Sequence, residues 1–282
     1  MLKVLGIGDN VCDKYRHLGK MFPGGQALNI AVHARREGHF AGYMGVFGND
    51  TVGKHVKKVL KDLRIDTSHC REYEGENGFA LIDLKNGDRV FVMSNKGGVL
   101  KEHPIVLSGE DLSYIETFDW VHTSNNSYID EELPKLAGAS KFLSYDFSTS
   151  YTDCIRNEYV CKYVDSAFLS CADMDTGEIK RLLEHMNRWG CPLLTATRGE
   201  KGVLTYDGRR YFEHKPEPIK AVDTLGAGDS FAAGFLLSYL ENRKNHGIGL
   251  AEVIDKALKK GAAMSARTCM EYGAFGCGTD LV

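Results

Sequence analysis

The sequence lacks an excess of charge of either sign. Its 282 residues include 35 lysines and arginines against 38 aspartates and glutamates, a formal net charge of −3. Proteins that bind nucleic acid or an anionic membrane through surface charge carry a clear positive excess. We therefore expect neither nucleic acid nor a membrane among the partners of this protein.

Long hydrophobic runs are also missing. No stretch approaches the roughly 20 apolar residues of a membrane-spanning helix. Asp9 interrupts the first apolar run before it reaches the length of a secretory signal core. The cysteines include no C-x-x-C pair, so we expect reduced thiols rather than disulfides or a zinc site. These features predict a cytoplasmic protein.

Short apolar runs alternate with helical periodicity along most of the chain. The strand-like runs begin at Val4, Tyr43, Trp120, Phe142, Ala167 and Leu193. Apolar residues at 27, 30, 31 and 34 follow the spacing of one helix face, and residues 176–189 and 231–240 are further helix candidates. A hairpin is expected at residues 203–212. The alternation predicts an α/β fold with helices on both faces of a mainly parallel sheet.

One segment interrupts this alternation. Residues 79–84 and 89–93 are strand-like and flank Asn86-Gly87, a strong signal for a hairpin turn. A hairpin inserted into an α/β chain often forms a lid or a subunit contact. We predict a single domain over residues 1–282 with a small β lid inserted at about 79–95. Exposed edges on so small a sheet favour pairing, so we expect a homodimer.

Two glycine-rich segments only imitate nucleotide-binding loops. After Gly6-Ile7-Gly8, Val11 stands where the dinucleotide fingerprint needs a third glycine. Residues 48–54 have the spacing of a phosphate loop, but His55 follows where a serine or threonine hydroxyl must bind Mg²⁺. A turn that leads into a helix explains residues 48–54 better.

The most informative segment is Asp223-Thr224-Leu225-Gly226-Ala227-Gly228-Asp229-Ser230-Phe231. Its small residues let the backbone approach a ligand closely, and a helix is expected directly after them. Loop amides and a helix N-terminus would then converge on an anion. Asp229 is either an N-cap of that helix or a general base beside a transferring phosphoryl group. The spacing alone leaves both interpretations open.

Residues 223–231 resemble the D-T-x-G-A-G-D-x-F signature of the ribokinase-like carbohydrate kinases, the PfkB family. Three more segments resemble motifs of that family in the same order: residues 24–31 (G-G-x-x-x-N-x-A), 48–53 (G-x-D-x-x-G) and 197–202 (T-x-G-x-x-G). The resemblance implies a ribokinase-like three-layer α/β/α fold. It also implies an ATP-dependent kinase that phosphorylates a primary hydroxyl of a sugar or of a sugar–amine (Amadori) adduct.

The resemblance implies a role for each matching residue. Asp229 would be the catalytic base, beside an anion hole formed by Gly226, Ala227 and Gly228. The acceptor site would comprise Asp9, Asp13, Gly24, Gly25, Asn29 and Arg89. The nucleotide site would comprise Ser170, Thr197, Gly199 and Gly202. Asp173 would serve Mg²⁺, while Asp223 and the Leu225 carbonyl would bind a monovalent cation, so the expected cofactors are ATP, Mg²⁺ and K⁺.

Within the family, the similarity is greatest to kinases that act on fructoselysine, through residues 8–13, 88–91 and 145–148. Two motifs depart from the family pattern. Ser170 and Asp173 replace a common Asn and Glu, and residues 146–150 lack the arginine of a D-x-N-x-R motif. Either the acceptor differs from that of other family members, or Arg89 or Lys96 neutralises phosphate instead. The alternatives are a kinase for a plain sugar or nucleoside, and a catalytically silent sugar-binding protein.

Overall fold

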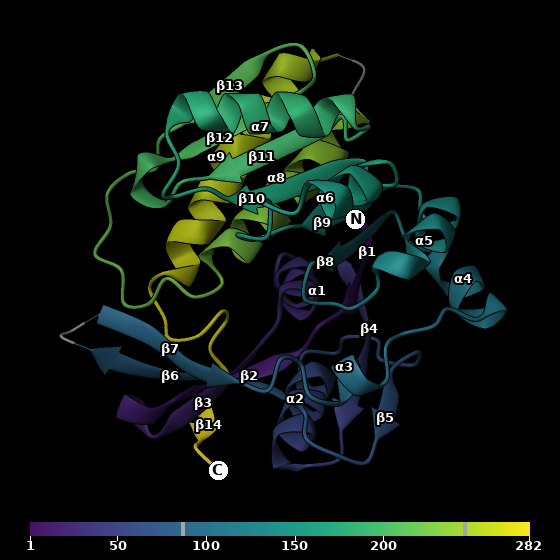
Figure 1. Ribbon diagram of the computed structural model, residues 1–282, viewed down its shortest axis with the longest axis vertical. Coiled ribbons are helices and arrows are strands. Elements are labelled where there is room, and N and C mark those ends of the chain that lie inside the picture. Colours follow the sequence, from purple (N-terminus) through teal and green to yellow (C-terminus); the bar gives the residue numbers. More distant parts are fainter. Residues whose placement is uncertain (86–87, 245–246) are drawn as a thin grey trace.

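Two β-sheets of unequal size organise the chain (Figure 1). The structure is a computed structural model that describes residues 1–85, 88–244 and 247–282, without side-chain placement for residues 84–89. The larger sheet lies between layers of helices, and the smaller sheet lies beside it near the C-terminus.

Within the described residues, the main sheet has nine strands in the order β13-β12-β11-β10-β9-β8-β1-β4-β5. They are β1 (Lys3–Gly8), β4 (Phe40–Gly48), β5 (Arg71–Tyr73), β8 (Trp120–Ser124), β9 (Leu143–Asp146), β10 (Ser166–Ser170), β11 (Leu193–Thr197), β12 (Val203–Tyr206) and β13 (Tyr211–His214). From β11 to β5 all neighbours are parallel. The antiparallel pair β12–β13 is the predicted hairpin at residues 203–212.

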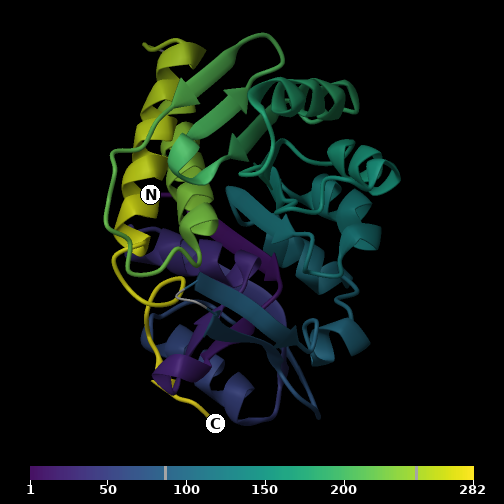
Figure 2. The ribbon, with the colours of Figure 1, turned by 60° about the vertical axis from the view of Figure 1, so that its left-hand side comes forward.

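Helices cover both faces of the main sheet (Figure 2). One face packs against α1 (Gln26–Arg36), α2 (Thr51–Asp62), α8 (Ala227–Arg243) and α9 (Leu250–Thr268). The other packs against α3 (Val99–Glu102), α4 (Gly109–Ile115), α5 (Leu133–Ala139), α6 (Cys154–Cys161) and α7 (Thr176–Arg188). Because side chains alternate along a strand, Val4 of β1 lies in the first core while Leu5 and Ile7 lie in the second. None of the described helices combines the length and apolar character that a membrane span requires.

The second sheet is larger than the predicted hairpin. Its order is β14-β3-β2-β6-β7, formed by β2 (Val11–Tyr15), β3 (Lys20–Gly24), β6 (Gly78–Lys85), β7 (Asp88–Ser94) and β14 (Thr279–Asp280). The expected lid at about 79–95 supplies only β6 and β7. The other strands are short and mostly mix polar with apolar residues, so their local pattern gives little strand signal.

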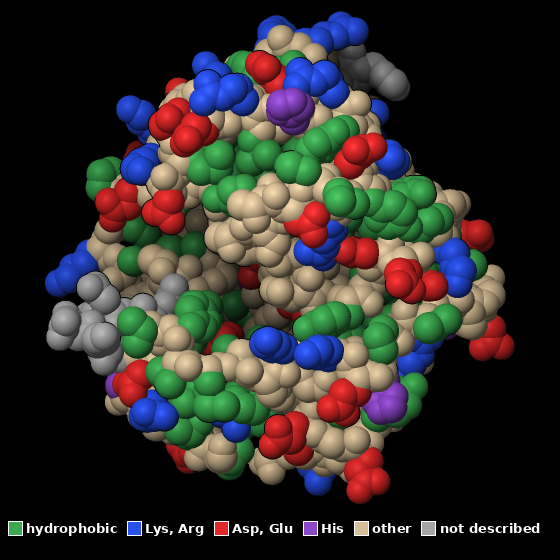
Figure 3. Space-filling view, in the orientation of Figure 1, with side chains coloured by type: hydrophobic (Ala, Val, Ile, Leu, Met, Phe, Trp, Pro, Cys, Tyr) green, Lys and Arg blue, Asp and Glu red, His purple; other side chains and the backbone are tan. Residues whose placement is uncertain are grey.

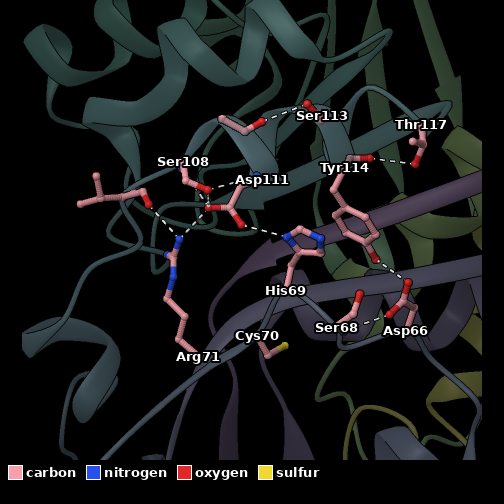
Figure 4. A network of polar contacts seen from close by, with 12 residues as sticks. Asp66, Ser68, His69, Cys70, Arg71, Ser108, Asp111, Ser113, Tyr114 and Thr117 are labelled. Atoms are coloured by element: carbon pink, nitrogen blue, oxygen red, sulfur yellow. Dashed lines mark hydrogen bonds and ion pairs between the residues drawn. The ribbon is translucent and has the colours of Figure 1, made fainter.

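A polar network attaches the β5 end of the main sheet to α4 (Figure 4). His69 Nδ1 lies 3.0 Å from Asp111 Oδ1, and Arg71 donates to Asp111 Oδ2 at 2.8 Å. Ser108 and Asp111 form a reciprocal capping box at the start of α4. Burial raises the pKa of Asp111, but the hydrogen bonds from Ser108 and His69 and the charge of Arg71 outweigh it, so the net pKa is lowered. This carboxylate therefore contributes to stability.

Candidate active site

Two cavities meet at the N-terminus of α8. The first, of about 490 Å³, lies between the main sheet and the second sheet. The second, of about 500 Å³, lies on the other side of the helix N-terminus. Leu225, Gly226 and Asp229 line the first cavity, whereas Thr224, Ala227 and Gly228 line the second. The signature segment is therefore a wall shared by both cavities, and the space-filling view shows a hollow with acidic side chains between the two sheets (Figure 3).

Glycine is required where α8 begins. Gly226 occupies the N-cap with a left-handed backbone (φ 72°), and a Cβ there would lie 2.4 Å from Ala274 Cβ. The N-cap residue supplies no side-chain hydrogen bond to the helix. Of the amides predicted to form the anion hole, that of Ala227 donates to Thr224 O at 3.3 Å. Because the residues at the start of α8 line both cavities, the amides of its first turn and its positive helix end lie where the cavities meet.

Asp229 lies in the first turn of α8 and points across to α1. Asn29 Nδ2 donates a 2.5 Å hydrogen bond to Asp229 Oδ2, although the two residues are 200 positions apart. Burial raises the pKa of Asp229 to about 6, the bond from Asn29 opposes this rise, and the charge of Asp9 adds to it. Gly226 rather than Asp229 occupies the N-cap. A carboxylate with this pKa can exchange a proton near neutral pH.

Asp9 follows β1 and holds the start of α1. Its Oδ2 accepts from the Gln26 amide at 2.7 Å, and its Oδ1 accepts from the Ala27 amide at 3.0 Å. The hydroxyl of Ser124 also donates to Oδ1, at 2.9 Å. Asp9 lines the first cavity, but much of its hydrogen-bonding capacity positions α1 and therefore Asn29.

The glycine pair before α1 makes room for the acceptor-side carboxylates. A Cβ on Gly24 would lie 2.9 Å from Asp13 Oδ2, and one on Gly25, where φ is 118°, would lie 2.6 Å from Asp9 O. Asp13 and Gly25 line the first cavity. The last residue predicted for this site, Arg89, belongs to β7, but its side chain lies outside the described residues.

The predicted nucleotide residues divide into two groups. Thr197, Gly199 and Gly202 line the second cavity, at the turn between β11 and β12. Ser170 and Asp173 line neither cavity. Asp173 is exposed in a turn, and the described residues contain no cluster of three or more histidine, cysteine or acidic side chains that would bind a metal.

Asp223 fastens the signature segment to the second sheet. Its carboxylate accepts hydrogen bonds from the Tyr15 hydroxyl of β2, from the Leu225 amide at 3.0 Å and from the Gly273 amide at 3.0 Å. Leu225 also packs against the apolar cluster that Tyr15, Phe22 and Ile82 form in the second sheet. Movement of the second sheet would therefore be transmitted to the start of α8.

One acidic residue close to Asp229 was not predicted as a site residue. Asp146 lies at the carboxyl end of β9 and is buried. Burial and the neighbouring charge of Asp229 raise its pKa to about 7, while the Ser148 amide and the Gln26 side chain oppose the rise. Its position supplied a usable signal, because the carboxyl ends of parallel strands share one edge of a sheet and ligands bind there. Asp9 follows β1 at the same edge.

The fold places two adjacent cavities on either side of one helix N-terminus, an arrangement that suits an α/β enzyme with separate sites for two substrates. The sequence model of the pfkB family carbohydrate kinases matches residues 10–279. The chain belongs to this family.

Relatives with assigned names agree with this membership. The chain is 38% identical over 278 residues to the fructosamine kinase FrlD of Bacillus subtilis strain 168, which covers 98% of this chain and 94% of the relative. It is 32% identical over 270 residues to the fructoselysine 6-kinase of Escherichia coli K12, and the match covers 95% of this chain and 98% of that relative. The structure of an Arabidopsis thaliana ribokinase complexed with ribose and ATP superposes with a TM-score of 0.81 at 17% identity, and the match covers 99% of this chain and 96% of that ribokinase. The predicted family, the three-layer fold and the enzyme class, an ATP-dependent sugar kinase, are confirmed.

Proposed function

We propose that this protein transfers the γ-phosphoryl group of ATP to the primary hydroxyl of an Amadori adduct, with fructoselysine as the reference substrate and fructoselysine 6-phosphate as product. The observation that carries the proposal is the position of Asp229. Its carboxylate lies in the first cavity, next to the helix end that also borders the second cavity, and is oriented by Asn29.

The reaction uses these groups as follows. The acceptor hydroxyl in the first cavity gives its proton to Asp229, and its oxygen forms the new bond to the γ-phosphorus. The bond between the γ-phosphorus and the bridging oxygen breaks, and ADP leaves from the second cavity. The amides of Gly226, Ala227 and Gly228 would stabilise the charge on the transferring group, that of Ala227 by exchanging its bond to the Thr224 carbonyl oxygen for one to the phosphoryl group. A base of this kind contributes roughly 10²–10⁴-fold to the rate.

The charge of the first cavity favours an acceptor that carries an amine. Asp9, Asp13 and Asp229 line it, and Lys96 is the one cationic residue among the described lining residues. A protonated secondary amine, present in an Amadori adduct and absent from fructose or ribose, would complement this acidic surface. Two relatives that share 38% and 32% identity with this chain are named for fructosamine and fructoselysine.

ATP would bind in the second cavity, along Thr197, Gly199 and Gly202. Mg²⁺ is usually held by substrate phosphates together with one or two carboxylates, so the ion would enter the site bound to the phosphates of ATP. A K⁺ ion at Asp223 and the Leu225 carbonyl would share the carboxylate with three hydrogen-bond donors. These bonds support a role of Asp223 in holding the loop.

The second sheet would act as a lid and as a dimer contact. Ala80, Phe91 and Ser94 from its outer hairpin line the first cavity. β7 is an edge strand whose residues Phe91, Val92 and Met93 are 62%, 48% and 54% exposed. An apolar edge of this kind pairs readily with a second copy. Sedimentation that detects only monomer at micromolar concentration would exclude the dimer.

An assay of ADP release tests the proposed substrate. The kcat/KM for fructoselysine should exceed those for fructose, ribose and a nucleoside by at least about tenfold. An equal or higher value for a plain sugar or nucleoside would establish one of the alternative kinases. Binding without turnover of any acceptor would establish a silent sugar-binding protein.

A further inference from the structure

A strained corner at the first cavity presents a single lysine. Lys96 and Tyr128 both line the cavity, and both have left-handed backbone conformations, with φ of 55° and 51°. Such conformations are uncommon for residues other than glycine. They persist only where the surroundings impose them, and they are concentrated at ligand-binding sites.

The two residues hold each other in place. The Tyr128 hydroxyl donates to the Lys96 carbonyl oxygen at 2.7 Å, and the Lys96 amide donates to Ser94 Oγ at 2.9 Å. A Cβ on Gly97 would lie 3.2 Å from the Tyr128 ring, so the ring passes close to this backbone. Asn95 fastens the same turn to the second sheet through the Phe79 amide at 2.9 Å. The backbone that carries Lys96 is thus preorganised.

The side chain of Lys96 forms no ion pair with any carboxylate in the described part of the protein. The residue is exposed. Lys96 lines the first cavity and not the second, which argues against a role with the nucleotide phosphates. The cavity, of about 490 Å³, is also larger than one hexose needs, so part of it is available for a tail.

We propose that Lys96 binds the carboxylate of the amino-acid part of the acceptor, and that Tyr128 is the positioning residue that holds Lys96 in its strained conformation. This inference rests on the proposed function, because only an Amadori adduct of an amino acid supplies the carboxylate. The sugar hydroxyls would lie toward Asn29 and Asp229, and the tail would extend along the Lys96–Tyr128 wall.

The test compares two adducts that differ in one group. Fructoselysine and fructosyl-cadaverine have the same sugar, secondary amine and terminal ammonium, but only fructoselysine has a carboxylate. The wild type should have a kcat/KM about tenfold higher for fructoselysine, since charge-assisted bonds are the stronger ones. Lys96→Met should remove most of this preference by raising the KM for fructoselysine. It should not impair fructosyl-cadaverine, since that adduct is cationic and loses a repelling charge. Tyr128→Phe should weaken the preference less, again through KM.

Lys101→Met is the matched control, because Lys101 is exposed on the neighbouring α3 and lines neither cavity. It should behave as the wild type. If Lys96→Met impairs both adducts equally, or lowers kcat rather than raising KM, the carboxylate site is wrong while the proposed function stands. A wild type that prefers fructose to both adducts would contradict the proposed function itself.

Discussion

The carboxylates of Asp111, near β5, and Asp229, at the first cavity, are both subject to burial, which favours the protonated form. Their net pKa shifts nevertheless have opposite signs. The pKa of Asp111 is lowered, because Ser108, His69 and Arg71 all stabilise the ionised form (Figure 4). The pKa of Asp229 is raised to about 6, and among the causes of its shift only the bond from Asn29 stabilises the ionised form.

The supply of hydrogen-bond donors, rather than burial, separates a structural carboxylate from a reactive one. A carboxylate that accepts several charged or amide hydrogen bonds keeps its negative charge and fastens two elements together. Asp229 instead has another acidic residue, Asp146, as a neighbour. Such a pair binds a proton more readily, and it leaves acceptor capacity for a substrate hydroxyl.

Replacing Asp229 with Asn should produce the largest change. Asn keeps the size of the side chain but cannot accept the hydroxyl proton, so kcat should fall by at least about 100-fold. The native pKa of about 6 lies above the ordinary 3.8, so the ionised carboxylate lowers stability at pH values above 6. The melting temperature of the variant at pH 8 should therefore equal or exceed that of the wild type. Near-wild-type turnover would exclude Asp229 as the base.

Replacing Asp111 with Ala should affect stability and leave catalysis intact. It removes the partner of Arg71 and His69 and the capping box, at a cost of about 3 kcal/mol in the free energy of unfolding. The lowered pKa means that this stabilisation is present above the ordinary value of 3.8 and is lost as the pH falls through the lower native value. Urea unfolding of the wild type and the variant at pH 7 measures the loss in the free energy of unfolding, and the same experiment in strong acid measures how far the difference disappears. A drop in kcat of the folded variant would contradict the separation of the two regions.

The Asp229→Asn variant also tests the coupling of the acidic pair. In the wild type, kcat/KM should fall as the pH drops below about 6, because Asp229 then becomes protonated. The charge of Asp229 is one of the causes that raise the pKa of Asp146 to about 7, so in Asp229→Asn the pKa of Asp146, followed by NMR of its carboxyl carbon, should fall by roughly half a unit to one unit. Asp173→Asn, at an exposed residue outside both cavities, should leave the pKa of Asp146 unchanged. If the pKa of Asp146 did not move in Asp229→Asn, the two carboxylates would titrate independently.

The smallest expected effect is that of Gly24→Ala, which fills the space next to the Asp13 carboxylate. In Gly24→Ala the new Cβ would lie 2.9 Å from Asp13 Oδ2 and would displace that group. The KM for the sugar should rise severalfold, roughly 1 kcal/mol of binding, with the KM for ATP unchanged. Gly138→Ala in α5, where a Cβ meets nothing within 4 Å, is the control. Equal effects on both substrates would argue against an acceptor site at Asp13.

Local pattern was sufficient for much of the fold. The apolar runs at β1, β4 and β8 to β11 and the hairpin at residues 203–212 could be predicted directly, because strand burial and turn chemistry depend on neighbours in sequence. The second sheet could be predicted only in part, since it assembles residues 11–24, 78–94 and 279–280.

The sequence by itself determined the signature loop, since glycine at 226 and small residues around it dictate a helix start that can approach an anion. Only the tertiary structure decided which side chains surround Asp229. Asn29 reaches it across 200 residues, and Asp146 arrives from the end of another strand. It also left Ser170 and Asp173 out of both cavities. The pKa of a carboxylate depends on the burial and charges that remote segments bring to it, and no local spacing encodes these.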